Sequence, residues 1–167
     1  MGGWQPERSQ SAVFIGLCYE ALGDDRKAIE NFQRAFQIDA SRREPLLRLA
    51  RLYYRKNDHQ RVACYAEAAL TIPLSNFYSN NAEDYRHVPH EFLFWSHFYL
   101  GNKEKAKEHF DKAVMFFPSH PKYLAEMEFF YELPTVSFVI PTLERPEGLK
   151  KCLESIKKLN YPQEKID

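Results

Sequence analysis

Residues 14–40, FIGLCYEALGDDRKAIENFQRAFQIDA, recur 34 positions later as RLARLYYRKNDHQRVACYAEAALTIPL at residues 48–74. The matching positions are mostly small or aromatic: Gly16 with Ala50, Tyr19 with Tyr53, Gly23 with Asn57, Ala28 with Val62, Phe32 with Ala66, and Ala35 with Ala69. A third segment, FLFWSHFYLGNKEKAKEHFDKAVMFFP at residues 92–118, aligns with the second at an offset of 44, which is the same period plus ten inserted residues. A period of 34 residues predicts a repeat protein in which each unit stacks on its neighbours.

Each copy carries the signals of two helices joined by a tight turn. In the first copy the apolar residues Ala28, Ile29, Phe32, Ala35 and Phe36 follow a helical stripe. Gly23, Asn57 and Gly101 share one register and suit the left-handed residue that ends a helix, and Pro73 and Pro118 end the second helices. We therefore predict helices near 10–22, 25–38, 44–56, 59–71, 88–100 and 103–116, with a further helix at 121–132.

This pattern of small and aromatic positions resembles the tetratricopeptide repeat. The resemblance implies a mainly α fold, an α-α superhelix of about three helix hairpins with a capping helix. We assign residues 1–133 to this helical domain, with repeats at about 9–42, 43–74 and 87–120, an insertion at 75–86 and the capping helix at 121–132. Small residues at the shared positions allow antiparallel helices to approach closely.

In such an array the first helices line a concave surface. The geometry of the repeat places there Gln10, Val13, Leu17, Glu20 and Ala21 of the first copy, Glu44, Leu47, Arg51, Tyr54 and Arg55 of the second, and Val88, Glu91, Trp95, Phe98 and Tyr99 of the third. Arginine and aromatic side chains bind ligands by charge-assisted hydrogen bonds and stacking. We predict a groove for a peptide, a protein or a glycan acceptor at Arg51, Tyr54, Arg55, Glu91, Trp95 and Tyr99. The alternative is that Trp95 and Phe98 pack against the insertion or the capping helix.

A different architecture is predicted after Pro134. VSFVI at residues 136–140 has the β-branched, aromatic composition of a buried strand. The segment from Pro146 to Pro162 has a helical stripe at Leu149, Leu153, Ile156 and Leu159, and EKID at 164–167 is typical of the start of a second strand. Residues 134–167 therefore predict the incomplete first unit of an α/β domain.

This segment resembles the start of a family 2 glycosyltransferase, an α/β nucleotide-sugar transferase. The resemblance implies that Pro141, Thr142, Glu144 and Arg145 contact the nucleotide-sugar, while Leu143 departs from the aromatic residue common in that family. The Asp-x-Asp motif that binds a divalent metal and the carboxylate that acts as catalytic base are both absent, so we expect no catalytic or metal-binding residue in this chain and a metal cofactor only in a full-length enzyme. We expect the chain to be the N-terminal fragment of such an enzyme, not catalytically competent alone. The alternative is a non-enzymatic scaffold that binds a peptide or protein.

Composition narrows the partners and the compartment. Lys and Arg together number 23, as do Asp and Glu, so the chain lacks the positive charge that nucleic-acid binding requires. No apolar run approaches the roughly 18 residues needed to span a bilayer. Cys18, Cys64 and Cys152 stand far apart, which favours reduced thiols and a cytoplasmic protein. Five histidines lie between His87 and His120 without the spacing of a metal site.

Overall fold

The computed structural model describes residues 4–74, 80–118, 120–127, 130, 135–141, 145–159 and 166–167. Contacts divide the chain into two compact units, Met1–Phe117 and Pro118–Asp167, and each is described here by itself. Within the described residues there are eight α-helices, one short 3-10 helix and no strand.

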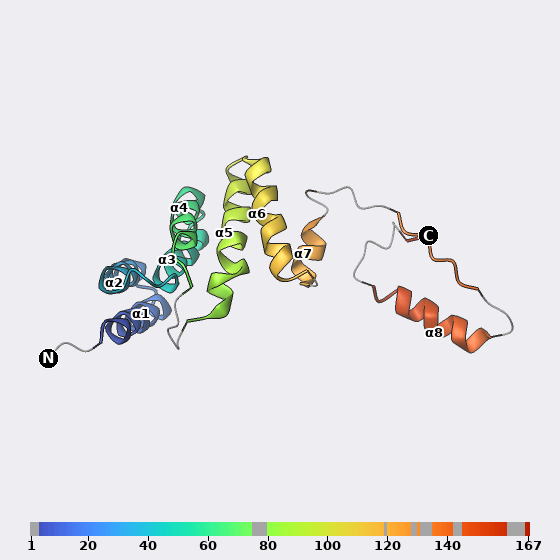
Figure 1. Ribbon diagram of the computed structural model, residues 1–167, viewed down its shortest axis with the longest axis horizontal. Coiled ribbons are helices and arrows are strands. Elements are labelled where there is room, and N and C mark those ends of the chain that lie inside the picture. The colour runs from blue at the N-terminus through green and yellow to red at the C-terminus, as the bar shows by residue number, and fades with distance from the viewer. Residues whose placement is uncertain are drawn as a thin grey trace. The chain divides into compact units, whose positions relative to one another are not determined.

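The first unit consists of three antiparallel helix pairs that follow one another along the chain (Figure 1). Helix α1 packs on α2, α3 on α4 and α5 on α6, and the pairs contact each other through α2 with α3 and α4 with α5. The 3-10 helix η1 precedes α5 and packs against it. The bounds are α1 Gln5–Ala21, α2 Asp25–Ile38, α3 Glu44–Arg55, α4 His59–Leu70, η1 Ala82–Tyr85, α5 His87–Tyr99 and α6 Lys103–Phe116. These bounds lie within a few residues of the six helices predicted from the repeat.

Each hairpin turn uses the left-handed residue that the sequence predicts. Gly23 has φ 76°, Asn57 has φ 56° and Gly101 has φ 78°. Glycine adopts this region without strain, and asparagine tolerates it better than most residues. In the first two turns an aspartate follows and caps the next helix, because the side chain of Asp24 accepts a hydrogen bond from Lys27 N and that of Asp58 accepts one from Arg61 N, both at 3.1 Å.

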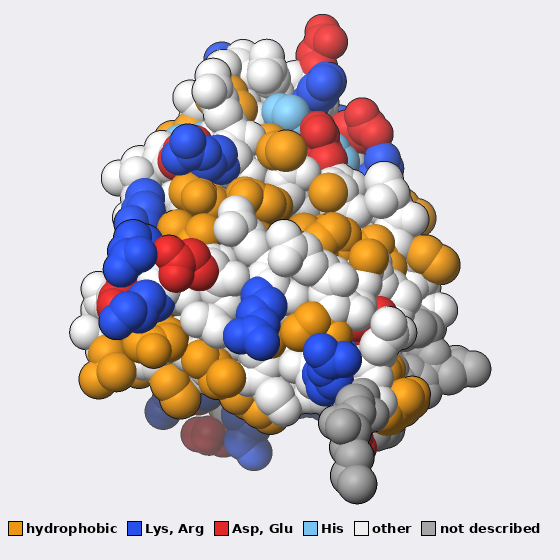
Figure 2. Space-filling view, turned by 90° about the vertical axis from the view of Figure 1, so that its left-hand side faces the viewer, with side chains coloured by type: hydrophobic (Ala, Val, Ile, Leu, Met, Phe, Trp, Pro, Cys, Tyr) orange, Lys and Arg blue, Asp and Glu red, His pale blue; other side chains and the backbone are white. Residues whose placement is uncertain are grey.

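The core runs along the contacts between the helices. In the first hairpin Gly16 lies against the ring of Phe32, so closely that a Cβ at Gly16 would be 2.5 Å from Cε1 of that ring. The two leucines Leu49 and Leu52 of α3 join the same apolar cluster, and in the next layer Leu93 of α5 packs with Ala63 and Ala66 of α4. The small residues of the repeat are thus the positions where neighbouring helices meet. At the end of the array where α1 lies, hydrophobic side chains also reach the surface, between scattered Lys and Arg (Figure 2).

The second unit contains α7 Pro121–Glu126 and α8 Pro146–Ile156. Helix α7 ends well before residue 132, the predicted end of the capping helix, and residues 128, 129 and 131–134 lie outside the described part of the chain. The predicted strand at 136–140 is not formed as a strand: its described residues make one isolated parallel bridge, between Val136 and Ile166. A single bridge does not satisfy the definition of a strand, which needs neighbouring ladder pairs on the same segment.

Candidate functional site

A polar cavity of about 200 Å³ lies between α3, the first turn of α5 and the described end of the insertion. Its lining residues are Glu44, Leu47, Arg48, Arg51, Asn81, Asp84 and Val88. Four of these, Glu44, Leu47, Arg51 and Val88, are concave positions in the predicted repeat geometry. Asn81 and Asp84 come from the insertion, so the described end of the inserted segment forms one wall of the cavity.

The charged side chains around this cavity differ in their exposure to solvent and in their partners. Arg51 is exposed, and Arg48 Nη2 lies 3.4 Å from Glu44 Oε1. Burial and the nearby carboxylate of Glu44 raise the pKa of Asp84 to about 6, although Arg48 and Arg51 act in the opposite direction. The cavity therefore combines two arginines, of which Arg48 is paired with Glu44, with Asp84, a carboxylate that is incompletely stabilised as an anion.

A series of aromatic rings in contact runs from α3 to the C-terminal end of α5. Tyr54 has ring contacts with His59 at 5.8 Å and with Phe92 at 6.1 Å between centroids. Tyr99 stacks on His59 at 4.4 Å and lies parallel to Trp95 at 5.9 Å. Burial lowers the pKa of His59, so this ring is neutral at pH 7. Three predicted groove residues, Tyr54, Trp95 and Tyr99, thus belong to one aromatic cluster, and Tyr99 is its exposed member at 56%.

The other two predicted groove residues are placed differently. Arg55 Nη1 pairs with Glu20 Oε1 at 2.7 Å, and its Nη2 lies 3.7 Å from Asp25 Oδ1. These contacts tie the second hairpin to the first. Glu91 is half-buried on α5 and does not line the cavity.

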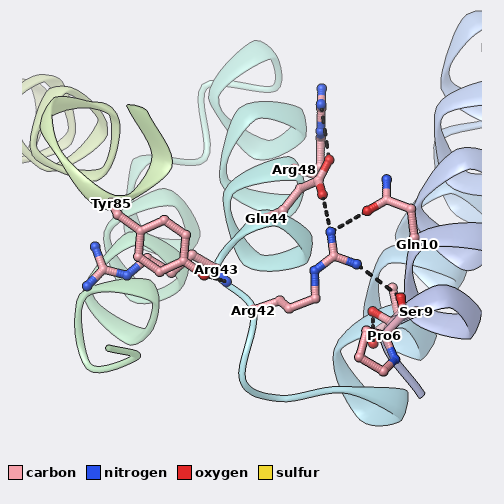
Figure 3. A network of polar contacts seen from close by, with 9 residues as sticks. Pro6, Ser9, Gln10, Arg42, Arg43, Glu44, Arg48 and Tyr85 are labelled. Carbon is pink, nitrogen blue, oxygen red and sulfur yellow. Dashed lines mark hydrogen bonds and ion pairs between the residues drawn. The ribbon is translucent and has the colours of Figure 1, made fainter. Parts of the chain in front are cut away.

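Two adjacent arginines before α3 make long-range contacts: Arg42 reaches the first hairpin, and Arg43 reaches the end of α4 and the insertion (Figure 3). The fully buried Arg42 donates from Nη2 to Gln10 Oε1 and to Glu44 Oε2, the latter at 2.7 Å, and from Nη1 to Pro6 O at 3.4 Å. Arg43 donates from Nε to Ile72 O at 2.7 Å. Sequence reasoning missed this pair, and the only signal was an Arg-Arg step in the loop between two repeats.

Histidines from α5 and α6 meet across the third hairpin. The Nδ1 atoms of His90 and His109 are 3.0 Å apart, and the ring of His97 stacks on His109 at 5.8 Å between centroids. Burial is the main cause that lowers the pKa of each, that of His90 to about 4. No group of three or more metal-binding side chains occurs in the part of the chain that the structure describes.

The four residues assigned to a nucleotide-sugar site are only partly described. Thr142 and Glu144 lie outside the described residues, as does Leu143. Pro141 and Arg145 are exposed, and Arg145 precedes the first residue of α8. Two hydrogen bonds accompany the parallel bridge of this unit, from Asp167 N to Val136 O and from Phe138 N to Asp167 O, both at 2.9 Å.

Among the described residues, no helix has both the length and the apolar composition needed to cross a bilayer.

Comparisons with known proteins agree on the repeat. The tetratricopeptide repeat family model matches residues 9–42 and 95–120. It does not match the second copy, where Val62 and Ala66 replace the alanine and phenylalanine found in the others. A comparison with curated proteins found no significant match.

Solved structures of low sequence identity share the fold. The N-terminal domain of stress-induced protein-1 (STI-1) from C. elegans is 12% identical with a TM-score of 0.65, over 77% of this chain and 98% of that one. The first TPR of Spaghetti (RPAP3) bound to HSP90 peptide SRMEEVD is 14% identical with a TM-score of 0.62, over 74% and 93%. The crystal structure of MamA is 16% identical with a TM-score of 0.60, over 91% and 74%. The tetratricopeptide repeat model thus covers the hairpin α1–α2 and most of the hairpin α5–α6, and the likeness to these solved structures shows the same fold of successive helix hairpins.

Proposed function

We propose that this chain is a tetratricopeptide scaffold that binds an extended segment of a partner protein along the surface formed by α3, η1 and α5. The observation that carries the proposal is the polar cavity at this surface, lined by Arg48 and Arg51 and located one helical turn from Tyr54. A peptide needs both kinds of contact, because charged groups orient it and exposed rings contribute contact area.

The charge of the cavity suggests the kind of segment. Arg51 is exposed and has no hydrogen bond or ion pair among the described residues, so an acidic side chain of a partner gains a charge-assisted bond there without breaking an existing one. One of the similar solved structures is described as bound to a peptide of sequence SRMEEVD, which is rich in carboxylates. This likeness supports a peptide as the ligand class and acidic residues as its recognised feature.

A peptide-display selection against the full chain tests the proposal. Peptides that it yields are measured by titration calorimetry against the wild type and the variants Arg51→Glu and Tyr99→Ala. We expect each variant to weaken binding by about tenfold or more, since a lost charged contact contributes on the order of 1.5–3 kcal/mol and a lost aromatic anchor about 2 kcal/mol. Arg34→Glu is the matched control, because Arg34 is an exposed arginine of α2 away from this surface. Selected peptides that bind all of these proteins equally would contradict the proposal.

A second candidate rests on the unit Pro118–Asp167. We propose for it that residues 134–167 begin a family 2 glycosyltransferase domain, with the repeats holding a protein or glycan acceptor. The supporting observation is that the bridge between Val136 and Ile166 is parallel and that α8 lies between these residues in the chain, which is the order of a strand-helix-strand crossover. The divalent metal of such an enzyme would be held by residues that this chain does not contain.

The transcript of the native gene tests this second candidate. The glycosyltransferase proposal predicts that the reading frame continues past the codon of Asp167. The continuation should encode a strand that ends in aspartate, followed by an Asp-x-Asp motif. A stop codon directly after Asp167 would contradict it. The chain itself is expected to show no measurable binding of a uridine or guanosine diphosphate sugar, because a single helix with one isolated bridge cannot form both walls of a nucleotide pocket.

A further inference from the structure

In the part of the chain that the structure describes, the polar cavity is lined by an arginine and an aspartate whose charged groups have no partner. Glu44 is engaged at both oxygens, Oε2 by Arg42 at 2.7 Å and Oε1 by Arg48 at 3.4 Å. Arg51 and Asp84 remain, and neither charged group has an ion pair or a hydrogen bond with another described residue. A partner carboxylate that binds Arg51 therefore enters a small space that Asp84 already lines.

The contacts of η1 hold Asp84 in this wall of the cavity. Its backbone N donates to Asn81 O at 3.1 Å, and the side chain of Asn81 caps the same turn by accepting from Glu83 N at 3.1 Å. Arg43 Nη1 donates to Asp84 O at 3.4 Å, so this guanidinium contacts the backbone of the aspartate and not its carboxylate. Because the backbone is anchored on both sides, the carboxylate stays at the cavity when a ligand enters.

The charged groups around Asp84 act in both directions on its ionisation. From α3, Arg48 and Arg51 favour the ionised carboxylate. Glu44 of the same helix and the exposed Glu83 of η1 oppose it, and the α5 residue that lines the cavity is an uncharged valine. Burial is the largest effect, and the pKa of Asp84 rises to about 6. A second carboxylate in the same cavity raises this pKa further, because like charges oppose each other's ionisation.

We infer that Asp84 couples the binding of an acidic segment at this cavity to the uptake of a proton, so that the segment binds more tightly when Asp84 is neutral. This inference rests on the proposed function and makes the insertion the part of the site that responds to pH. At pH 7.5 the protonated form is a minor fraction, about one in thirty, and the apparent affinity falls with that fraction. A cationic segment is disfavoured at the same cavity by Arg48 and Arg51.

Fluorescence anisotropy of the full chain with a synthetic peptide of four glutamates, blocked at both ends and carrying a neutral dye, tests the inference. The peptide stays ionised at pH 5.5 and at pH 7.5, because the ordinary pKa of glutamate is about 4.3. We expect the dissociation constant of the wild type to be about tenfold or more higher at pH 7.5 than at pH 5.5. In Asp84→Asn it should change by less than about threefold between the two pH values. An equal pH dependence in Asp84→Asn, or tighter binding of the wild type at pH 7.5, would overturn the inference.

Two further variants separate the possible causes. Glu83→Gln is the matched control, because it removes the same charge from the adjacent residue, which is exposed and does not line the cavity. A gain in affinity at pH 7.5 equal to that of Asp84→Asn would show that net charge alone is measured, which overturns the inference. If Arg51→Glu leaves peptide binding unchanged, or if no peptide binds at either pH, the proposed function fails and this inference with it. If Arg51→Glu abolishes binding while Asp84→Asn keeps the pH dependence, only this inference fails.

Calorimetry in two buffers of different ionisation enthalpy counts the protons directly. At pH 7.5 the wild type should take up about one proton for each peptide bound, and Asp84→Asn should take up none. Binding by the wild type without proton uptake would overturn the inference.

Discussion

The guanidinium of Arg43 lies over the ring of Tyr85, with 4.6 Å between Cζ and the ring centroid. The backbone N of Arg43 also donates to the Tyr85 hydroxyl at 3.5 Å, and its side chain donates to carbonyls near the end of α4. One side chain thus satisfies the last carbonyls of a helix and fixes the insertion against the array. Because the insertion forms a wall of the polar cavity, Arg43 determines the shape of the candidate site without lining it.

Removal of Arg43 is therefore expected to destabilise the fold and loosen the insertion. Arg43→Ala should lower the free energy of unfolding by about 2–4 kcal/mol, because it leaves a buried carbonyl at Ile72 without its donor. Tyr85→Phe keeps the ring and loses one hydroxyl, so it should cost about 0.5–1 kcal/mol. Urea denaturation measures both. Equal effects of the two substitutions would show that the guanidinium of Arg43 contributes no more to stability than the single hydrogen bond of the Tyr85 hydroxyl.

Gly16 and Phe32 form a matched pair in the first hairpin. Gly16→Ala should destabilise the protein by about 1–3 kcal/mol, because the new methyl group meets a fully buried ring. Phe32→Ala alone should cost about 3–5 kcal/mol through the cavity it leaves. The second repeat has alanine at both equivalent positions, Ala50 and Ala66, so the double variant copies an arrangement that the protein already contains.

A double-mutant cycle checks this coupling. We expect the double variant to lose less stability than the sum of the single variants by about 0.5–3 kcal/mol, since the methyl group of Gly16→Ala then enters the space vacated by the ring. Purely additive losses would mean that the two positions do not pack against each other.

The repeat could be predicted because its signals are local. A period of 34 residues, a glycine or asparagine at each turn and helical apolar stripes all act within one hairpin, and the structure confirms the helices that they predict. The groove stays a prediction: Arg51 lines the polar cavity, whereas Arg55 is paired with Glu20, a partner 35 positions earlier in the chain. Helix positions in the repeat determine which way a residue faces, and they do not determine what it meets there.

Contacts over long separations explain the remaining gaps. The anchoring of Arg43 to Tyr85 spans 42 positions, and the histidine pair of α5 and α6 joins residues 19 apart on different helices. Neither leaves a pattern in a single sequence. The strand predicted at 136–140 had the right composition, yet a strand forms through partners, and the described residues supply Val136 with one bridge.

The turn residue Asn57 offers a test of backbone strain. Its φ of 56° matches the two glycine turns, so Asn57→Gly should stabilise the protein by a few tenths to about 1 kcal/mol. Asn57→Ala should destabilise it by about 1 kcal/mol, because alanine tolerates the left-handed region less well than asparagine. Thermal unfolding followed by circular dichroism ranks the three proteins. If the Asn57→Ala variant were at least as stable as the Asn57→Gly variant, the conformational explanation would be contradicted.

Acid should weaken the third hairpin through His90 and His109. The folded protein holds the pKa of His90 at about 4, below its ordinary 6.5, so the unfolded chain binds the proton more readily. Stability is therefore full above about pH 6.5 and falls as the pH drops toward 4. In the neutral pair one Nδ1 atom carries a proton and the other accepts it. Protonation of both rings would place two N–H groups and two positive charges against each other, and the rings would repel.

The variant His90→Phe separates this effect from general acid denaturation. Phenylalanine retains a ring that stacks on Phe116, which lies 6.1 Å from the His90 ring. Urea unfolding at pH 7 and at pH 4.5 should show a smaller loss of stability in the variant than in the wild type, by about 1–2 kcal/mol. His87→Phe is the matched control, because the His87 ring lies 6.1 Å from that of Phe117 and is outside the histidine cluster. The same loss in all three proteins would rule out the cluster as the cause.

Asp84 should give a pH dependence of the opposite sign. Its folded pKa of about 6 lies above the ordinary 3.8, so the folded protein retains the proton more readily than the unfolded chain. The stabilisation is present below pH 3.8 and is lost as the pH rises through about 6. Asp84→Asn cannot ionise, so at pH 8 it should exceed the wild type in stability by about 1–2 kcal/mol, with the difference vanishing near pH 4. Glu83→Gln removes a neighbouring exposed carboxylate that is the smallest of the causes raising the pKa of Asp84, so it should shift the pH dependence of the wild type only slightly. A constant difference in stability between Asp84→Asn and the wild type at every pH would show that burial does not oppose ionisation at this wall of the cavity.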